Sequence, residues 1–210
     1  AQSDEMIAEE REVSVLLCDL SGFTTLSEHM APSELAQVLN DLFARLTNAI
    51  FRFEGTLDKF MGDAVMAIFG APLTQPDHAE RAVGAAILMQ HALEDLNRSH
   101  AHRQKVSMRV GINSGNVVAG DIGSPKRKDY TVLGDTVNVA SRLESSVAKP
   151  GQIAIGPLTY EMVKGRYDCL RLEPVKLKGK KDSVQPFLVQ GAVRCDIRSE
   201  RQTWTDEILP

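Results

Sequence analysis

The 210-residue sequence contains only three cysteines and no run of about 18 apolar residues. Cys18, Cys169 and Cys195 are odd in number and far apart, which argues against a disulfide framework and against a zinc site. A reducing compartment suits such thiols, so we expect a cytoplasmic protein or the cytoplasmic part of a larger, membrane-bound one. Without a long apolar run, this segment is expected to make no direct membrane contact.

An excess of basic residues is also missing: 24 Lys and Arg stand against 28 Asp and Glu. Such a balance gives no basic field for nucleic acid, and the lysines of 176–181 lack interleaved aromatic residues. The length and the 43% apolar content suit one globular domain with short tails. We expect a polar N-terminal segment, 1–10, leading from an upstream regulatory region, a domain over 11–190, and a polar tail over 191–210.

Apolar patterning predicts alternating strands and helices in the first half of the chain. The expected order is strand, helix, two-strand hairpin, helix and strand, at 13–18, 32–55, 55–69, 77–96 and 106–112. This order predicts an α+β, ferredoxin-like (split βαβ) fold, with an antiparallel sheet and helices packed on one face.

The second half is expected to continue with helices and a hairpin. A glycine-punctuated stretch, 111–123, follows the last of these strands. Asp135 is positioned to start a third helix through Glu144, and Pro157 can open a fourth. Alternation over 167–189 predicts a terminal hairpin.

Two acidic residues occur where the predicted sheet would bring them together. Asp19 ends the first buried strand, and Asp63 lies in the hairpin turn beside Gly62. Neighbouring carboxylates repel, so one would take up a proton unless a cation lay between them. Taken singly, each Asp is more simply a turn residue. Taken together, they predict a site for two divalent cations, Mg²⁺ or Mn²⁺, with substrate phosphates completing the coordination.

The loop after Asp19 favours a phosphate-binding role over a plain turn. Backbone amides of Gly22, Phe23 and Thr24 could form a nest of donors around a triphosphate.

Five segments together resemble the class III nucleotidyl cyclases, and in particular the bacterial adenylyl cyclases. They occur in the family's order, which is far more specific than any single motif. The segments span 15–24, 57–67, 108–115, 130–144 and 175–180. The resemblance implies a ferredoxin-like cyclase domain that is active as a head-to-tail homodimer and converts ATP to cyclic AMP and pyrophosphate in cyclic-nucleotide signalling.

The resemblance also implies which residues bind metal and base. Asp19 and Asp63 match the two metal-binding acids, and the Leu20 carbonyl matches the backbone ligand. Lys59 and Thr131 match the pair that recognises the purine. A Lys donates hydrogen bonds but accepts none, which suits adenine N1, whereas guanine N1 carries a hydrogen. Thr131 takes the place of an Asp found in animal enzymes, as in bicarbonate-responsive members, so bicarbonate is a candidate effector.

The remaining implied roles concern ribose and phosphate. Asn138 and Arg142 lie four residues apart on one predicted helix face and match the pair that orients the ribose and stabilises the transition state. Arg109 and Lys178 match the cations that hold the phosphates. In the family, each site takes the acids from one subunit and the Lys, Asn and Arg set from the other.

The sequence leaves two other functions open. A cyclic-dinucleotide synthase would use a similar two-metal palm, but it usually carries a Gly-Gly-acid-acid turn, whereas this chain has Met61-Gly62-Asp63-Ala64. A catalytically dead cyclase-like domain would serve as a nucleotide sensor or dimerisation module. Loss of an acid, or of Asn138 or Arg142, would mark that case, and all of them are present.

Overall fold

The computed structural model describes residues 8–21, 31–99, 105–124, 126–178 and 182–193. The strands are β1 Glu9–Ser21, β2 Thr56–Met61, β3 Ala64–Phe69, β4 Ser107–Ser124, β5 Arg127–Leu133, β6 Ile153–Ile155, β7 Tyr167–Arg171 and β8 Phe187–Ala192. The helices are α2 Pro32–Arg52, α3 His78–Ser99, α4 Asp135–Arg142, the π-helix η1 Leu143–Val147, and α5 Pro157–Val163. None of the helices in these ranges combines the length and hydropathy needed to cross a lipid bilayer.

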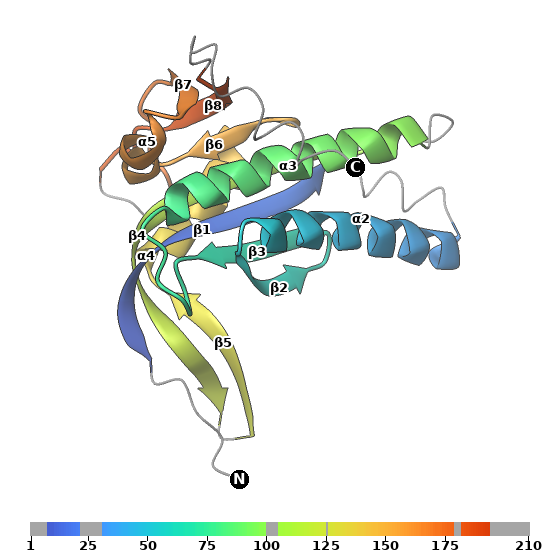
Figure 1. The fold of residues 1–210 in the computed structure, drawn as a ribbon, viewed down its shortest axis with the longest axis horizontal. Helices are drawn as coiled ribbons and strands as arrows, with labels where there is room; N and C mark the ends of the chain where they lie inside the picture. The colour runs from blue at the N-terminus through green and yellow to red at the C-terminus, as the bar shows by residue number, and fades with distance from the viewer. Residues whose placement is uncertain (1–7, 22–30, 100–104, 125, 179–181, 194–210) are drawn as a thin grey trace, which may run out of the picture.

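The sheet follows the order β2-β3-β1-β4-β6-β8-β7, with β5 paired to β4 (Figure 1). Its first four strands are antiparallel neighbours, as the split βαβ pattern predicts, so the α+β fold class is confirmed. The expectation of a wholly antiparallel sheet is wrong, because β4 pairs with β6 in parallel. A parallel neighbour needs a crossover connection, and α4 and η1 lie in that connection.

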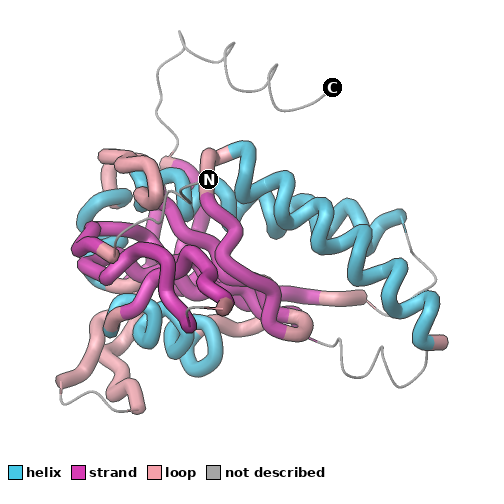
Figure 2. The backbone as a smooth tube through the Cα atoms, turned by 90° about the horizontal axis from the view of Figure 1, so that it is seen from below, coloured by secondary structure: helices cyan, strands magenta, loops and turns pink. Residues whose placement is uncertain are grey.

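Both faces of the sheet are covered by helices, rather than one face as the pattern predicts (Figure 2). Along β1, Leu16, Cys18 and Leu20 join the core with α2 and α3, whereas Val15 and Leu17 join a second cluster with α4. Successive strand residues point to opposite faces, and β1 is apolar at both sets of positions. A strand that is apolar on both faces must be covered on both.

The long helices α2 and α3 lie side by side across one face of the sheet (Figure 1). Their predicted apolar stripes are confirmed: Leu42, Leu46 and Ile50 of α2 and Ala82 and Met89 of α3 are buried. Burying a Leu or Met side chain contributes about 1.5–3 kcal/mol each, so this face holds much of the core's stabilisation.

Strands β4 and β5 form an arm that extends away from the body of the domain (Figure 1). The glycine-punctuated stretch predicted after residue 112 continues β4 to Ser124. Glycine here allows close backbone approach instead of ending the strand, because a Cβ on Gly120 would lie 2.6 Å from the Cα of Ala8.

Candidate active site

The two predicted metal-binding acids lie at the same end of the sheet. In the β1–β3 register Asp19 faces Ala64, and Asp63 is the residue directly before Ala64. Gly62 holds the preceding turn position with φ +67°, a left-handed conformation that glycine adopts without strain. The hairpin turn therefore brings Asp63 beside the end of β1, as the sequence predicts.

Arg109 meets Asp19 across the neighbouring strand pair. The β1–β4 register pairs these two residues, and the Arg109 Nη2 atom forms an ion pair with Asp19 Oδ2. Both side chains extend from the sheet face that packs against α4, since Leu17 on β1 and Gly111 on β4 lie on that face. A cation predicted to hold phosphate is thus in contact with a predicted metal ligand.

Glu144, for which the sequence predicts no role, completes this end of the site. Its Oε1 atom lies 3.2 Å from Arg109 Nε, and its side chain is only 11% exposed. Burial raises the pKa of the Glu144 carboxyl to about 7; Arg109 opposes that rise, and the charges of Asp19 and Asp63 add to it. We refer to Asp19, Asp63, Arg109 and Glu144 as the acid cluster.

The predicted third helix changes form before Glu144. Helix α4 ends at Arg142, two residues earlier than expected, and η1 begins at Leu143. Gly111 lets this turn approach β4, because a Cβ there would lie 2.3 Å from the Ala140 carbonyl oxygen and 2.4 Å from the Glu144 nitrogen. A glycine at 111 and the wider turn of η1 therefore place Glu144 against the sheet.

The acid cluster suits hard divalent cations. Asp19 and Asp63 supply carboxylate oxygens at the same end of the sheet, and the charge of each raises the pKa of Glu144. No group of three or more His, Cys, Asp or Glu residues in the described ranges could hold a metal ion. Asp19 and Asp63 would therefore need further ligands that are not carboxylates of the described residues. Two carboxylates with a backbone carbonyl such as that of Leu20 fit Mg²⁺ or Mn²⁺, which take further ligands from water and phosphate.

The two residues predicted to recognise the purine also lie together. Lys59 on β2 donates from Nζ to Thr131 Oγ1 on β5 at 3.4 Å, although the residues are 72 positions apart. Lys59 Nζ also lies 3.3 Å from Asp58 Oδ2. The Asp58 side chain is only 1% exposed, whereas the Lys59 side chain is 46% exposed. The buried Asp58 carboxylate thus pairs with the Lys59 ammonium, which also donates to the Thr131 hydroxyl.

The remaining predicted residues have no contact with the acid cluster or with the Lys59–Thr131 pair that the described residues show. Asn138 on α4 is exposed and Arg142 is half-buried, and neither forms a hydrogen bond or ion pair with other described residues. Lys178 is exposed, just beyond the Val175–Val184 bridge. The predicted phosphate loop, Gly22, Phe23 and Thr24, lies outside the described residues.

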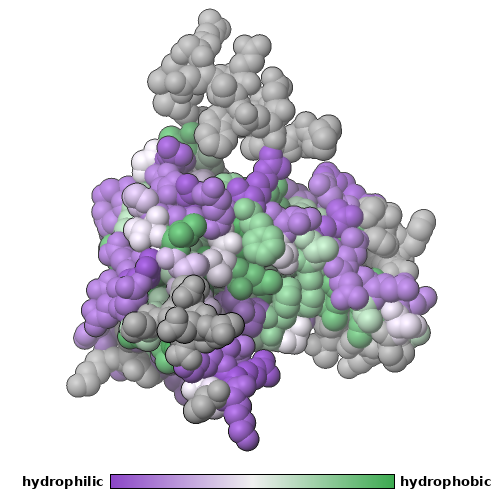
Figure 3. Space-filling view, turned by 60° about the horizontal axis from the view of Figure 1, so that its bottom comes forward, coloured by the Kyte–Doolittle hydropathy of each residue, from purple (hydrophilic) through white to green (hydrophobic). Residues whose placement is uncertain are grey.

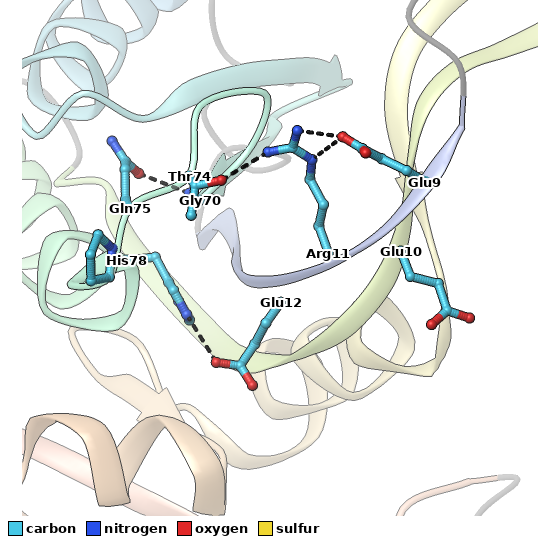
Figure 4. Close-up of a pocket in the computed structure, with 9 residues that line it drawn as sticks. Glu9, Glu10, Arg11, Glu12, Gly70, Thr74, Gln75 and His78 are labelled. Carbon is cyan, nitrogen blue, oxygen red and sulfur yellow. Dashed lines mark hydrogen bonds and ion pairs between the residues drawn. The ribbon is translucent and has the colours of Figure 1, made fainter.

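A separate hollow of about 410 Å³ lies between β1 and the loop before α3 (Figure 4). In it, Arg11 Nη1 donates to the Pro72 carbonyl at 2.7 Å, and the Gly70 amide donates to Gln75 Oε1 at 2.8 Å. These polar groups are satisfied by one another, which is typical of a structural connection. The lining residues are Glu9, Glu10, Arg11, Glu12, Gly70, Thr74, Gln75, Pro76 and His78.

A buried polar chain runs inward from that hollow. Glu12 Oε1 lies 3.5 Å from His78 Nε2, and His78 Nδ1 lies 2.8 Å from Ser14 Oγ. Ser14 Oγ is 2.6 Å from Ser114 Oγ, which is 2.9 Å from Thr159 Oγ1. Burial lowers the pKa of His78, while Glu12 opposes that shift. The hydroxyls are sealed in the interior, so this chain joins β1, β4, α3 and α5 and offers no accessible nucleophile.

Comparison with known proteins agrees with the resemblance seen in the sequence. A family model described as the adenylate and guanylate cyclase catalytic domain matches residues 6–191. An adenylate cyclase from Anabaena cylindrica is 37% identical over 196 residues, covering 87% of this chain. The chain spans only 38% of that relative's length.

Solved structures agree in both sequence and fold. The adenylyl cyclase CyaB from P. aeruginosa is 34% identical, with a TM-score of 0.86 over 90% of this chain and 98% of that chain. The guanylyl cyclase Cya2 is 39% identical, with a TM-score of 0.81 over 89% and 95%. The chain belongs to the family of adenylate and guanylate cyclase catalytic domains.

Proposed function

We propose that the chain is an adenylate cyclase that converts ATP to 3′,5′-cyclic AMP and pyrophosphate with two divalent cations, at shared sites of a head-to-tail homodimer. The observation that carries the proposal is the Lys59–Thr131 contact. It supports adenine as the base in a family whose members use either purine. The acid cluster supports the metal-dependent chemistry.

Adenine suits the Lys59–Thr131 pair better than guanine does. Lys59 is a pure donor and matches adenine N1, whereas guanine N1 carries a hydrogen that would face the ammonium. The Thr131 hydroxyl can accept from the adenine amino group. A base that leaves such partly buried polar groups unpaired is strongly disfavoured, so we expect a clear preference for ATP.

The chemistry requires an in-line displacement at the α-phosphorus. The ribose 3′-oxygen forms a bond to that phosphorus and its proton passes to solvent water. The bond between the α-phosphorus and the oxygen that bridges to the β-phosphate breaks, and pyrophosphate is released. Divalent cations bound by Asp19, Asp63 and the Leu20 carbonyl would lower the pKa of the 3′-hydroxyl and neutralise phosphate charge.

The chain's own side chains provide the remaining functions. Arg109 and Lys178 would hold the β- and γ-phosphates, with the Gly22, Phe23 and Thr24 amides beside them. These groups would restrain the leaving pyrophosphate while the new bond forms.

Residues on α4 would act on the reacting atoms. Asn138 would orient the ribose, and Arg142 would stabilise negative charge developing on the α-phosphoryl oxygens. In the described residues both side chains lack a partner, which favours a second chain as the source of their ligand.

Exposed apolar residues support dimerisation. Phe60 and Met61 on β2 are 44% and 43% exposed, and Val118 and Leu133, which face each other across β4 and β5, are 40% and 54% exposed. Figure 3 shows hydrophobic residues gathered in the middle of one face, with hydrophilic surface around them. A contiguous apolar area like the one that Figure 3 shows is typical of an interaction site.

Two further observations concern the setting of the domain. Free thiols at Cys18 and Cys169 suit the cytoplasm. The chain covers a minor part of the Anabaena relative, which suits a catalytic domain regulated by an upstream region. Bicarbonate, a small anion, is a candidate effector because Thr131 replaces a carboxylate near the base.

Product identification tests the proposal. The purified chain is incubated with ATP or GTP and with Mg²⁺ or Mn²⁺, and the products are separated and identified. We expect cyclic AMP and pyrophosphate from ATP in a metal-dependent reaction. Cyclic GMP as the main product would overturn the base assignment, a cyclic dinucleotide would overturn the reaction class, and no product with either metal would favour a sensor or dimerisation module.

A further inference from the structure

Glu144 contacts Arg109, the residue that we propose holds phosphate, at its Nε atom. Its Oε1 atom lies 3.2 Å from Arg109 Nε, while the Nη2 atom of the same guanidinium pairs with Asp19. A guanidinium is planar, so a partner at Nε fixes the direction in which the two terminal nitrogens point. The contact is an ion pair and not a hydrogen bond, and both atoms are buried without a hydrogen-bond partner among the described residues. Glu144 is therefore placed to set the direction of Arg109.

This contact becomes more important once the proposed metal is bound. A cation on Asp19 would compete with Arg109 for the same carboxylate and weaken their ion pair. Glu144 would then be the carboxylate that keeps Arg109 in place, with its terminal nitrogens free for phosphate oxygens.

The position of Glu144 in the chain adds a second consequence. It lies two residues after Arg142, on the turn that continues α4, yet its side chain is buried against Arg109. Arg142 is half-buried and unpaired among the described residues. Two residues that are close in the sequence therefore differ in their contacts: Glu144 is paired within its own chain, and Arg142 is not.

We propose that Glu144 is a positioning residue for Arg109 and that the α4–η1 segment links the two active sites of the dimer. The inference rests on the proposed function: Glu144 would act in the site that uses its own chain's acids, while Asn138 and Arg142 of the same chain serve the other site. One segment would thus contact the nucleotide of one site directly and act on the nucleotide of the other site through Arg109.

Heterodimers with a single intact site test the proposal. Asp63→Ala chains are mixed with Arg142→Ala chains, so that the working site takes its acids from the Arg142→Ala chain and its Arg142 from the Asp63→Ala chain. Glu144→Gln is then introduced into one chain or the other. In the acid-supplying chain it should lower kcat/KM for ATP roughly tenfold or more, mainly by raising KM. In the Arg142-supplying chain the change should stay within about twofold.

Equal losses from either chain would show that Glu144 acts only through general folding and would overturn the proposal, as would no loss from either. Glu161→Gln is the matched control, because Glu161 is an exposed carboxylate on α5 paired with Lys164. It should leave both heterodimers unchanged. Thermal melting of each variant checks that the isosteric Glu144→Gln change keeps the fold.

Inactive mixed chains would count against shared sites, and so against the proposed function. A double-mutant cycle in homodimers tests the role of Glu144 separately. Arg109→Lys keeps the charge but removes Nε. Affinity for inorganic tripolyphosphate is measured by calorimetry in homodimers carrying Glu144→Gln, Arg109→Lys or both. We expect the double variant to bind no more weakly than Arg109→Lys alone. Losses that multiply would show that Glu144 does not act through Arg109.

Discussion

The acid cluster and the exposed face of α4 differ in how far each is complete within one chain. In the cluster, Arg109 on β4 already contacts both Asp19 on β1 and Glu144 on η1. On α4, Asn138 and Arg142 form no hydrogen bond or ion pair with the described residues. The acid cluster is positioned by ion pairs within its own chain. The α4 face instead has side-chain donors without a partner among the described residues. The proposed two-chain active site accounts for this difference.

The largest effect is expected where the acid half is broken. Asp19→Ala or Asp63→Ala should lower cyclic AMP formation by roughly a hundredfold or more, because the proposed cations lose a carboxylate ligand. Turnover is measured with saturating Mn²⁺, and circular dichroism checks the fold. Asp95→Asn, an exposed carboxylate paired with Arg98 at the end of α3, is the control. Near-full turnover in either Ala variant would remove that residue from metal binding.

The next largest effect is expected at Lys59, which we propose recognises the base and which the family resemblance assigns to the same half as Asn138 and Arg142. Lys59→Glu should reduce kcat/KM for ATP by roughly tenfold or more and improve the relative use of GTP, since a carboxylate accepts from guanine N1 and repels adenine N1. Paired rate measurements with both nucleotides give the ratio. An unchanged ATP preference would exclude Lys59 from base recognition.

The connection between the halves can be weakened at Gly111. Gly111→Ala should push η1 away from β4, because the new Cβ would lie within 2.4 Å of backbone atoms of Ala140 and Glu144. We expect a loss of about 1–3 kcal/mol in the free energy of unfolding, together with weaker ATP binding. Gly165→Ala is the control, because a Cβ there meets nothing within 4 Å. Equal stability of the two variants would contradict the tight contact.

The smallest effect concerns the polar chain remote from both halves. Burial lowers the pKa of His78 in the fold, although Glu12 and Asp77 oppose that shift. The unfolded state then binds more protons, so stability is full above about pH 6.5 and falls as the pH drops through the lowered folded value. His78→Asn should flatten this acid loss in melting curves measured from pH 8 to pH 5. A melting temperature with the same pH slope in both proteins would exclude His78 as its cause.

Much of the fold could be predicted because local patterns specify it. The apolar runs of β1 and β3 and the stripes of α2 and α3 repeat with the periods of strand and helix, so their positions follow from the sequence. The sequence does not predict that α4 covers the second face of the sheet. A helix of only eight residues has too short an apolar stripe to indicate which face of a sheet it covers. Parallel pairing of β6 depends on a crossover that local sequence does not encode.

The candidate site divides in the same way. Asp19, Asp63, Lys59 and Thr131 lie where motif and topology predict, because strand register carries them there. Glu144 was missed because a buried ion pair across 35 residues leaves no local signal. A helix-ending acid directly opposite a glycine on a core strand, here Gly111, is the pattern that could have indicated it.

Mixing Asp63→Ala chains with Arg142→Ala chains tests the shared site most directly. Each homodimer should be inactive, and random exchange should restore cyclic AMP formation to about a quarter of the wild-type rate, because half of the dimers gain one intact site of two. Native mass spectrometry confirms that heterodimers form. Heterodimers that form but produce no cyclic AMP would contradict an active site built from the acids of one chain and the α4 face of another.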